Sequence, residues 1–335
     1  TNSYFAGYPI GVGGTGAAQT GTTAFAALAN SSIKAGGATT ISEQTTAAIN
    51  SAWSNALGTD FSVSYASPYT SSNTGVATVS GININSLQIG TTNINGTLTI
   101  NQNGLTATGF NAAAQQSIVP LSMPLTVTQT TPTITVDAIA SPSIGDSITI
   151  TATIADGYLP TGTVTFKNNG TAIGSPVTIA EIDHGVASIN CTIDSMTALS
   201  ITAEYSGDSN NAAATSTPAV TATVSKAHPV ISLSASPVSP GTFPEDIVLT
   251  ATLTDAYPSV ENQTITFTIN GSDYTAATNA SGVATYTITQ PAVDTYSIQA
   301  SYAGDANNDT AADSLSYDVN KGTQTSISVS GIADE

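Results

Sequence analysis

The sequence of 335 residues predicts a mainly β fold, with two tandem β-sandwiches behind a β-rich N-terminal domain that contains one amphipathic helix. Four sequence blocks return in the same order about 100 residues later, which indicates a duplicated domain. Short runs of alternating apolar and polar residues are separated by Gly, Pro, Asn and Asp, as in the strands and turns of a sandwich. Negative charge is concentrated in the repeated part, which marks a boundary before it.

The repeated blocks define two domains. The first copy contains the segments 147–156, 160–170, 185–189 and 201–208, and the second contains 246–255, 262–271, 282–286 and 298–305. We therefore expect one sandwich at 127–227 and the next at 228–321. The junctions are also equivalent, because Val224-Ser-Lys226 returns as Val319-Asn-Lys321 and Gln129 holds the same place upstream.

Three motifs carry a resemblance to a known family. They are the strand Gly162-Thr-Val-Thr-Phe166, the strand Gly185-Val-Ala187 and the turn Tyr205-Ser-Gly-Asp208, each with a counterpart in the second copy. Residues from about 127 to 335 resemble the bacterial or archaeal immunoglobulin-like repeats of surface adhesins, of the group 3 kind. The resemblance implies tandem immunoglobulin-like β-sandwiches that serve as spacers or adhesive modules, and it names no ligand.

The charge balance excludes several classes of partner. Four Lys, no Arg and 22 acidic residues give a formal net charge of −18. Nucleic-acid binding depends on Lys and Arg that displace phosphate counterions, and attachment to an anionic leaflet depends on the same residues. No run of 18 apolar residues is present, so we expect no membrane span in this chain.

The cysteine content indicates where the protein works. The single cysteine, Cys191, cannot form a disulfide within the chain, and the composition is rich in Thr, Ser, Asn and Ala. Such a composition fits an exported protein, so we expect an extracellular location at a cell or virion surface. The sequence opens on Thr1 rather than Met, which indicates a processed protein or a fragment.

The first 20 residues predict an extended, Gly-rich N-terminal segment. Residues 9–28, which include Gly13-Gly-Thr-Gly-Ala17, are weakly similar to the Gly-Gly-Thr-Gly-Ala repeats of phage tail fibres. A flexible Gly-rich lead-in is the simpler interpretation, because such a segment cannot build a core of its own.

Residues 21–126 predict the β-rich N-terminal domain with a helix at 41–57. Thr40 and Glu43 have the spacing of a capping box, apolar residues from Ile41 to Leu57 recur at helical spacing, and Gly58 follows as a C-terminal stop signal. Alternating strand patterns with Asn-Gly turns fill the stretch from Phe61 to Leu125. The segment 322–335 then repeats the opening strand of a sandwich, so it is either the first strand of a further repeat or a strand donated to another subunit.

The sequence predicts no enzyme. The two histidines, His184 and His228, fall in different repeats, and neither a zinc-type cluster nor a phosphate loop is present. The only cofactor considered is calcium, which takes oxygen ligands from Asp and Asn. Its candidate ligands are Asp208, Asn210, Asp305, Asn307 and Asp309. The alternative is a turn in which these side chains bond their own backbone.

We therefore expect a non-enzymatic extracellular structural or adhesive protein, a subunit of a microbial surface fibre or filament that polymerises with itself through inter-subunit β-strand contacts. Other partners would be a host or cell-surface glycan or protein. The residues expected to join subunits are Tyr4, Phe5, Tyr8, Ile10, Ile327 and Val329. Two alternatives stay open: a virion tail fibre or spike that attaches to a host, and a monomeric glycan-binding adhesin.

Overall fold

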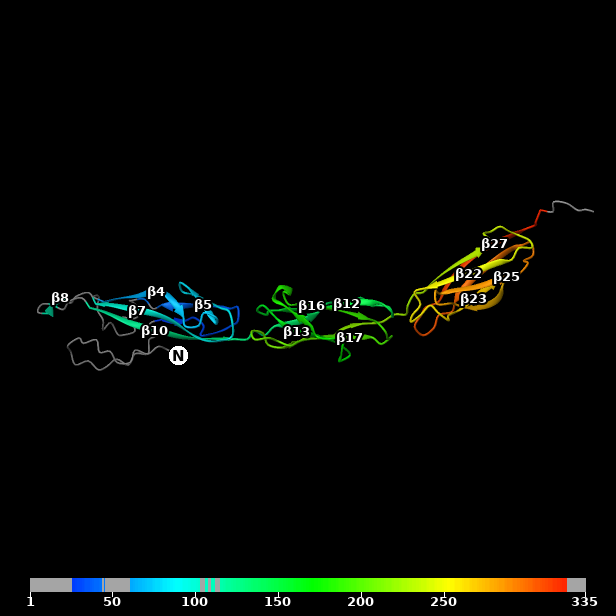
Figure 1. Cartoon of the computed structure of the whole chain (residues 1–335). Coiled ribbons are helices and arrows are strands. Elements are labelled where there is room, and N and C mark those ends of the chain that lie inside the picture. The colour runs from blue at the N-terminus through cyan, green and yellow to red at the C-terminus, as the bar shows by residue number, and fades with distance from the viewer. Residues whose placement is uncertain are drawn as a thin grey trace, which may run out of the picture.

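The computed structural model describes residues 26–43, 45, 61–102, 106–107, 110–111 and 115–323. Three β-sandwiches lie end to end along one line, with the third tilted against the other two (Figure 1). Among the described residues the only helix is a short 3₁₀ turn at Glu181–Asp183. The predicted mainly β fold is confirmed.

The N-terminal sandwich packs two four-stranded sheets face to face. One sheet has the order β1-β3-β6-β5 and the other β2-β10-β7-β4. The strands are β1 (Ala26–Leu28), β2 (Ser32–Lys34), β3 (Ala38–Glu43), β4 (Phe61–Ser71), β5 (Ala77–Ser80), β6 (Asn83–Ser86), β7 (Gly90–Gln102) and β10 (Gln115–Thr128), with a separate pair β8 (Thr106–Ala107) and β9 (Phe110–Asn111). Ile84, Ile94, Leu98 and Leu125 are fully buried in its core.

The predicted start of the helix is wrong. Ile41 lies in β3, where it pairs with Leu28 of β1, and Thr40 pairs with Asn83 of β6. Burial alternates along this strand, with Thr39 and Ile41 buried and their neighbours exposed. The β-branched run Thr39-Thr40-Ile41 suits a strand between two partners, so tertiary pairing outweighs the capping-box pattern. Residues 46–57 of the predicted helix lie outside the described residues.

The second sandwich has sheets ordered β11-β12-β16 and β14-β13-β17-β18, with β15 and β19 pairing β13 and β17. Its strands are β11 (Thr133–Val136), β12 (Ser147–Ala155), β13 (Gly162–Asn168), β14 (Thr171–Ala172), β15 (Val177–Ile179), β16 (Val186–Thr192), β17 (Leu199–Tyr205), β18 (Ala214–Thr215) and β19 (Val220–Ala222). Burial alternates strictly along β17, because every second side chain of a strand points into the core.

The third sandwich repeats this arrangement with sheets β20-β22-β25 and β21-β27-β26-β23-β24. Its strands are β20 (Val230–Ser236), β21 (Gly241–Thr242), β22 (Ile247–Thr254), β23 (Thr264–Ile269), β24 (Ser272–Ala277), β25 (Val283–Ile288), β26 (Thr295–Tyr302) and β27 (Ala311–Asn320). Phe166 of β13 and Phe267 of β23 are the aromatic centres of the two equivalent cores.

In the part of the chain that the structure describes, no helix is long and apolar enough to cross a membrane. The predicted extended segment 1–20 and residues 324–335 of the predicted C-terminal strand lie outside the described residues. Gly322 and Thr323, which are described, belong to no strand.

Candidate functional site

The Tyr-x-Gly-Asp turn of the second sandwich is organised by one carboxylate. Asp208 Oδ1 accepts hydrogen bonds from the backbone N–H groups of Asn210 and Asn211 at 2.7 and 2.8 Å. Asp208 Oδ2 accepts from the Tyr205 hydroxyl at 3.0 Å and from the Thr161 N–H at 2.8 Å. The carboxylate therefore closes the loop between β17 and β18 and ties it to the start of β13.

These bonds change the acidity of the carboxyl. Burial alone would raise the pKa of Asp208, but hydrogen bonds from Thr161, Asn211, Asn210 and Tyr205 outweigh it, so the pKa lies below its ordinary value. The Tyr205 hydroxyl responds in the opposite sense: burial, and then its bond to Asp208, raise the pKa of this phenol. Both shifts favour the charged Asp and the neutral Tyr that the turn contains at neutral pH.

The turn of the third sandwich is built in the same way. Asp305 Oδ1 accepts from the N–H groups of Asn307 and Asn308 at 2.7 and 2.8 Å, and Oδ2 accepts from the Tyr302 hydroxyl at 3.1 Å. Burial and the bond to Asp305 raise the pKa of Tyr302 to about 12. Tyr205 and Tyr302 thus pin their turns, as expected of structural tyrosines. We call these two segments, 205–211 and 302–308, the joining turns.

Each joining turn ends on a fully buried asparagine that holds a second tyrosine. The amide oxygen of Asn211 accepts from the Tyr158 N–H at 2.7 Å, and its amide nitrogen donates to the Tyr158 carbonyl at 2.9 Å. Asn308 makes the same pair of bonds to Tyr257, at 2.8 and 2.7 Å. Asn211 and Asn308 are both 0% exposed. The asparagine side chain thus makes the two backbone hydrogen bonds that a neighbouring β-strand would otherwise make to Tyr158 and Tyr257.

Each of these held tyrosines packs against the preceding sandwich. Tyr158 contacts the hydrophobic core of the N-terminal sandwich, and Tyr257 contacts the core of the second sandwich. Each ring lies over a glycine with positive φ: a Cβ on Gly36 would overlap the Tyr158 ring, and a Cβ on Gly145 would lie 3.0 Å from Cδ2 of Tyr257. We call Tyr158 and Tyr257 the junction tyrosines.

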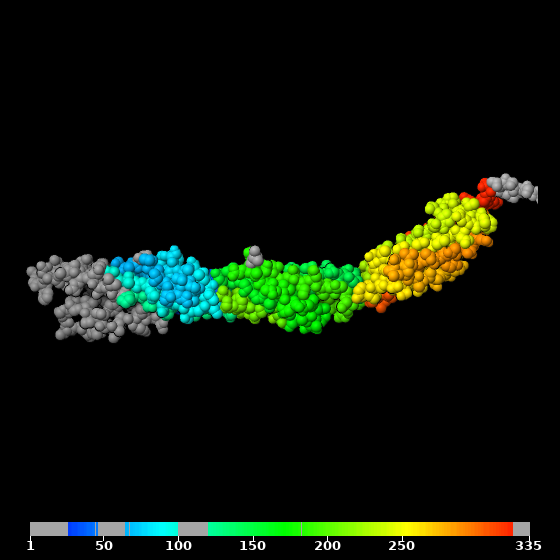
Figure 2. Space-filling model, in the orientation of Figure 1, coloured from blue at the N-terminus to red at the C-terminus, as the bar shows by residue number. Residues whose placement is uncertain are grey.

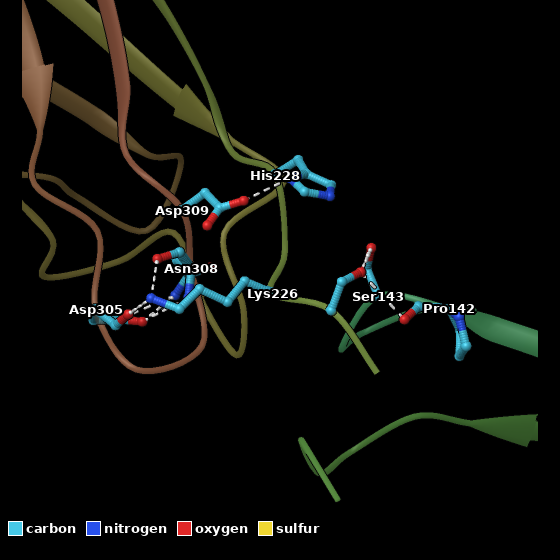
Figure 3. A network of polar contacts seen from close by, with 8 residues as sticks. Pro142, Ser143, Lys226, His228, Asp305, Asn308 and Asp309 are labelled. Carbon is cyan, nitrogen blue, oxygen red and sulfur yellow. Dashed lines mark hydrogen bonds and ion pairs between the residues drawn. The ribbon is translucent and has the colours of Figure 1, made fainter. Parts of the chain in front are cut away.

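The chain passes from one sandwich to the next through a single residue. At the second junction Ser225 still pairs with Ser143 of the second sandwich, and Ala227 already pairs with Asn308 of the third. Only Lys226 lies between them (Figure 3). At the first junction Thr128 ends β10 and Thr130 pairs with Asn211, which leaves only Gln129. We call Gln129 and Lys226 the connector residues.

The connector side chains anchor to the joining turns. Lys226 Nζ donates to the Asp305 carbonyl at 2.5 Å, and Gln129 Nε2 donates to the Asp208 carbonyl at 3.0 Å. Ala227, which follows Lys226, makes two backbone hydrogen bonds to the third sandwich. Its N–H donates to the Asn307 carbonyl at 2.8 Å, and its carbonyl accepts from the Asp309 N–H at 2.9 Å. His228 Nδ1 lies 2.8 Å from Oδ2 of Asp309, close to the same turn (Figure 3).

The structure brings the calcium candidates together within each turn. The oxygens of Asp208 and Asp305 face N–H and O–H donors, which occupy the positions that a cation would need. Among the described residues no group of three or more His, Cys, Asp or Glu side chains has the geometry to hold a metal ion. The geometry therefore favours the alternative, a self-bonded turn, which thermal unfolding with and without calcium can test.

The remaining candidates are separated or lie beyond the described residues. His184 ends the 3₁₀ turn of the second sandwich, whereas His228 opens the third. Cys191 is partly buried against the core of the second sandwich, and burial followed by Asp194 raises the pKa of its thiol. The expected subunit-joining residues Tyr4, Phe5, Tyr8, Ile10, Ile327 and Val329 lie outside the described residues.

Sequence reasoning missed the junction tyrosines and their asparagines. A signal was present, because Tyr158 and Tyr257 stand 53 and 51 residues before Asn211 and Asn308 and occupy equivalent places in the two copies. The residues around them differ, Gly157 and Leu159 in one copy against Ala256 and Pro258 in the other, so the pair is not part of a matched block.

Three solved structures show how this chain compares in shape. A 1.5-MDa bacterial ice-binding adhesin is 16% identical with a TM-score of 0.29, covering 87% of this chain and 95% of that chain. Fibronectin(III)-like modules of CbhA from Clostridium thermocellum are 21% identical with a TM-score of 0.24, covering 56% and 94%. A D1–D4 ectodomain fragment of ICAM-5 is 10% identical with a TM-score of 0.30, covering 89% and 77%. Identities and TM-scores this low transfer no function to this chain.

The family comparison is decisive for the two repeats. A search among curated proteins found no match. The model of the bacterial Ig-like domain (group 3) matches residues 134–225 and 233–320, which is more than half of the chain. Such domains are typically non-catalytic and point to a surface or adhesive structural role. The chain therefore belongs to the family of proteins built from bacterial Ig-like domains of group 3.

Proposed function

We propose that this protein is a non-enzymatic, extracellular component of a microbial surface fibre, in which the sandwiches form a stiff stalk. The observation that carries the proposal is the repeated junction. At both junctions one connector residue, one junction tyrosine and one buried asparagine recur in the same arrangement. A linker that only joined two independent domains would need none of these contacts.

The junction geometry supports stiffness in a specific way. The backbone is bonded to the preceding sandwich at Ser225 and to the following one at Ala227, so bending is confined to the torsions around Lys226. Ala227 is also buried in the core of the second sandwich, although its backbone bonds to the third. A flexible linker gains reach from many unbonded residues, and these junctions have one.

The charge distribution supports a passive structural role. The second and third sandwiches are strongly acidic, whereas the N-terminal sandwich carries little charge. An acidic surface keeps an extended protein soluble and opposes unspecific side-to-side association. Contacts between subunits would then have to come from sheet edges or from the ends of the rod.

One sheet edge is suited to strand addition. β24 (Ser272–Ala277) is a continuous edge strand of six residues, and five of its six residues are exposed. At the equivalent edge of the second sandwich the strand is divided into β14 and β15 with Gly174 and Pro176 between them. β24 contains neither Pro nor Lys, which commonly block such edges, and its one charged residue, Asp273, accepts from the Thr268 hydroxyl of the neighbouring strand at 2.6 Å. It is therefore the acceptor edge that we propose for a strand from another subunit.

Electron microscopy of the purified, untreated protein tests the proposal. Long fibres with a constant axial repeat are expected, and deletion of 322–335 or of 1–12 should then identify the donor by abolishing them. Thr275→Lys in β24 should prevent fibres, whereas Gln299→Lys on the interior strand β26 of the same sheet should not.

Other particle shapes in the same images would favour one of the two alternative functions. Trimers with short knobbed rods would favour the virion fibre or spike, and particles of monomer mass would favour the glycan-binding adhesin. Fibres that persist in both lysine variants would show that β24 is not the acceptor edge.

A further inference from the structure

The C-terminal end of the third sandwich repeats the geometry with which the second sandwich receives its neighbour. Asn320, the last residue of β27, pairs with Thr242 and accepts from the Phe243 N–H at 3.0 Å. Ser225 stands in the same place at the second junction, where it pairs with Ser143 and accepts from the Ile144 N–H at 2.9 Å. The next residue, Lys321, therefore occupies the position of a connector residue.

The side chains at this end differ from those of the covered end in one respect. Ile144 of the second sandwich is 4% exposed, whereas its counterpart Phe243 is 44% exposed. Val238 is 83% exposed and corresponds to Ile139, which packs partly buried against the core of the second sandwich. Figure 2 shows the yellow-green residues of this region gathered at the end of the rod where the red connector leaves.

We infer that this end, formed by Val238, Phe243, Pro244 and Lys321, is a docking face for the N-terminal end of another Ig-like domain of this same family. The incoming domain would bring a junction tyrosine and a joining turn. Its tyrosine would pack beside Val238 and Phe243, because Pro244 stands where Gly145 receives Tyr257 and its own ring atoms fill that place. Lys321 Nζ would donate to the aspartate carbonyl of the incoming turn, as Lys226 does to Asp305.

Two features on both sides of the contact support this partner over an unrelated one. The joining turn offers backbone carbonyls that a side-chain N–H donor satisfies, which is the Gln129 amide at the first junction and the Lys226 ammonium at the second. The exposed valine and phenylalanine offer apolar area to an aromatic ring, and burying such area stabilises the contact in proportion to its size. Exposed apolar side chains at the end of an otherwise acidic rod are typical of an interaction site.

The inference rests on the proposed stalk function and extends it by naming the domain that would continue the stalk beyond the third sandwich. The two can fail separately. Fibre formation tests how subunits assemble, whereas the docking face is tested by a lengthened chain in which a copy of residues 227–320 follows Lys321. In that chain the face has its proposed partner at high local concentration.

Amide hydrogen exchange of segment 237–246 is the measurement. We expect the amides around Phe243 to exchange at least about tenfold more slowly in the lengthened chain than in the natural one, because docking suppresses local opening. The protection should be lost when the counterpart of Tyr257 in the added copy is changed to Ala. In the lengthened chain, Lys321→Met should reduce the protection of this segment. Lys167 lies far from either junction, so Lys167→Met should leave the protection unchanged.

Equal exchange in the natural and lengthened chains would overturn the inference, provided that the added copy is folded. Its folding is read from protection of its own core strands in the same experiment. If those strands are unprotected, a copy of residues 130–227, which carries Tyr158 and its own joining turn, replaces it. Equal exchange with that folded copy would also overturn the inference.

Discussion

Asn211 holds the backbone of Tyr158 through both ends of its side-chain amide, with bonds of 2.7 and 2.9 Å, although the two residues stand 53 positions apart. The same amide oxygen also accepts from the Thr130 hydroxyl at 2.6 Å. One buried side chain thus connects the chain entry, the joining turn and the tyrosine that packs against the N-terminal sandwich. Asn308 does the corresponding work for Tyr257.

Replacing either asparagine should destabilise its sandwich. Asn211→Ala and Asn308→Ala each leave the part-buried N–H and carbonyl of a junction tyrosine without their side-chain partner, and a buried group left unsatisfied costs about 1–3 kcal/mol at most. We expect the unfolding transition of the affected sandwich in differential scanning calorimetry to fall by several degrees.

Neighbouring positions provide the controls for these two variants. Ser209 and Asn307 lie in the same turns but are not buried, so Ser209→Ala and Asn307→Ala should change the transition little. If the control variants were as damaging as the asparagine variants, the effect would belong to the turn as a whole and not to the buried amide.

Acid should destabilise the joining turns. The folded-state pKa of Asp208 and of Asp305 lies below the ordinary value of 3.8, because hydrogen-bond donors outweigh the cost of burial. A carboxyl with a depressed folded-state pKa stabilises the fold fully at pH values well above 3.8. This stabilisation declines as the pH falls below 3.8 and is lost once the pH has passed through the folded-state pKa.

Titration of two variants separates this effect from the general acid response. Asp208→Asn should be less stable than the natural protein at pH 7 and should show a shallower loss of stability between pH values of about 5 and 2. Asp156→Asn, which removes an exposed carboxylate outside the joining turn, should keep the natural slope. An unchanged slope in Asp208→Asn would show that the turn does not contribute to acid sensitivity.

Much of this architecture follows from the sequence, because its causes are local or repeated. Alternation in β17 and β23, with Tyr205 and Phe267 on the buried face, is visible in the residue order. The turn motif that places Tyr205 and Tyr302 three residues before an aspartate is also visible in both copies. Strand β3 was missed because Thr40, Ile41 and Glu43 satisfy a helical pattern locally, and only the pairing with β1 and β6 decides against it.

The junctions could not be predicted in the same way. Tyr158 and Tyr257 acquire their role from a contact with another domain, and their equivalent places in the two copies do not show what each ring contacts. Gly36 and Gly145 receive them, yet each glycine also satisfies a positive φ, so its presence alone indicates only a turn. The sequence shows that Gln129 and Lys226 hold equivalent positions, but it does not show that their side chains contact the carbonyls of the joining turns.

Calcium should leave the melting temperature unchanged. Asp208 and Asp305 already accept two or more N–H bonds on one oxygen and a tyrosine hydroxyl on the other, so a cation would have to displace these donors. Thermal unfolding with millimolar calcium and with EDTA is the measurement. A rise with calcium that disappears in Asp305→Asn would instead support the candidate calcium site at Asp305, Asn307 and Asp309.

The contact between Gly145 and Tyr257 can be tested with a glycine matched in backbone conformation. Gly145 has φ of +93° and Gly170 has φ of +81°, so alanine is strained at both positions. Only at Gly145 does the added Cβ meet a ring, 3.0 Å from Tyr257 Cδ2; at Gly170 nothing lies within 4 Å. Gly145→Ala should therefore cost about 1 kcal/mol more than Gly170→Ala, because the Tyr257 ring must shift by a few tenths of an ångström on the second sandwich.

Small-angle scattering gives the second measurement for this pair. Shifting Tyr257 should also change the angle of the third sandwich about Lys226, so the distance distribution of Gly145→Ala should differ from that of the natural protein. Gly170→Ala, which lies in a turn away from the junction, should keep the scattering of the natural protein while sharing the backbone strain. Identical scattering from both variants would mean that the ring contact does not set the angle, and that the single-residue connector, together with the backbone bonds of Ala227 to Asn307 and Asp309, is sufficient on its own.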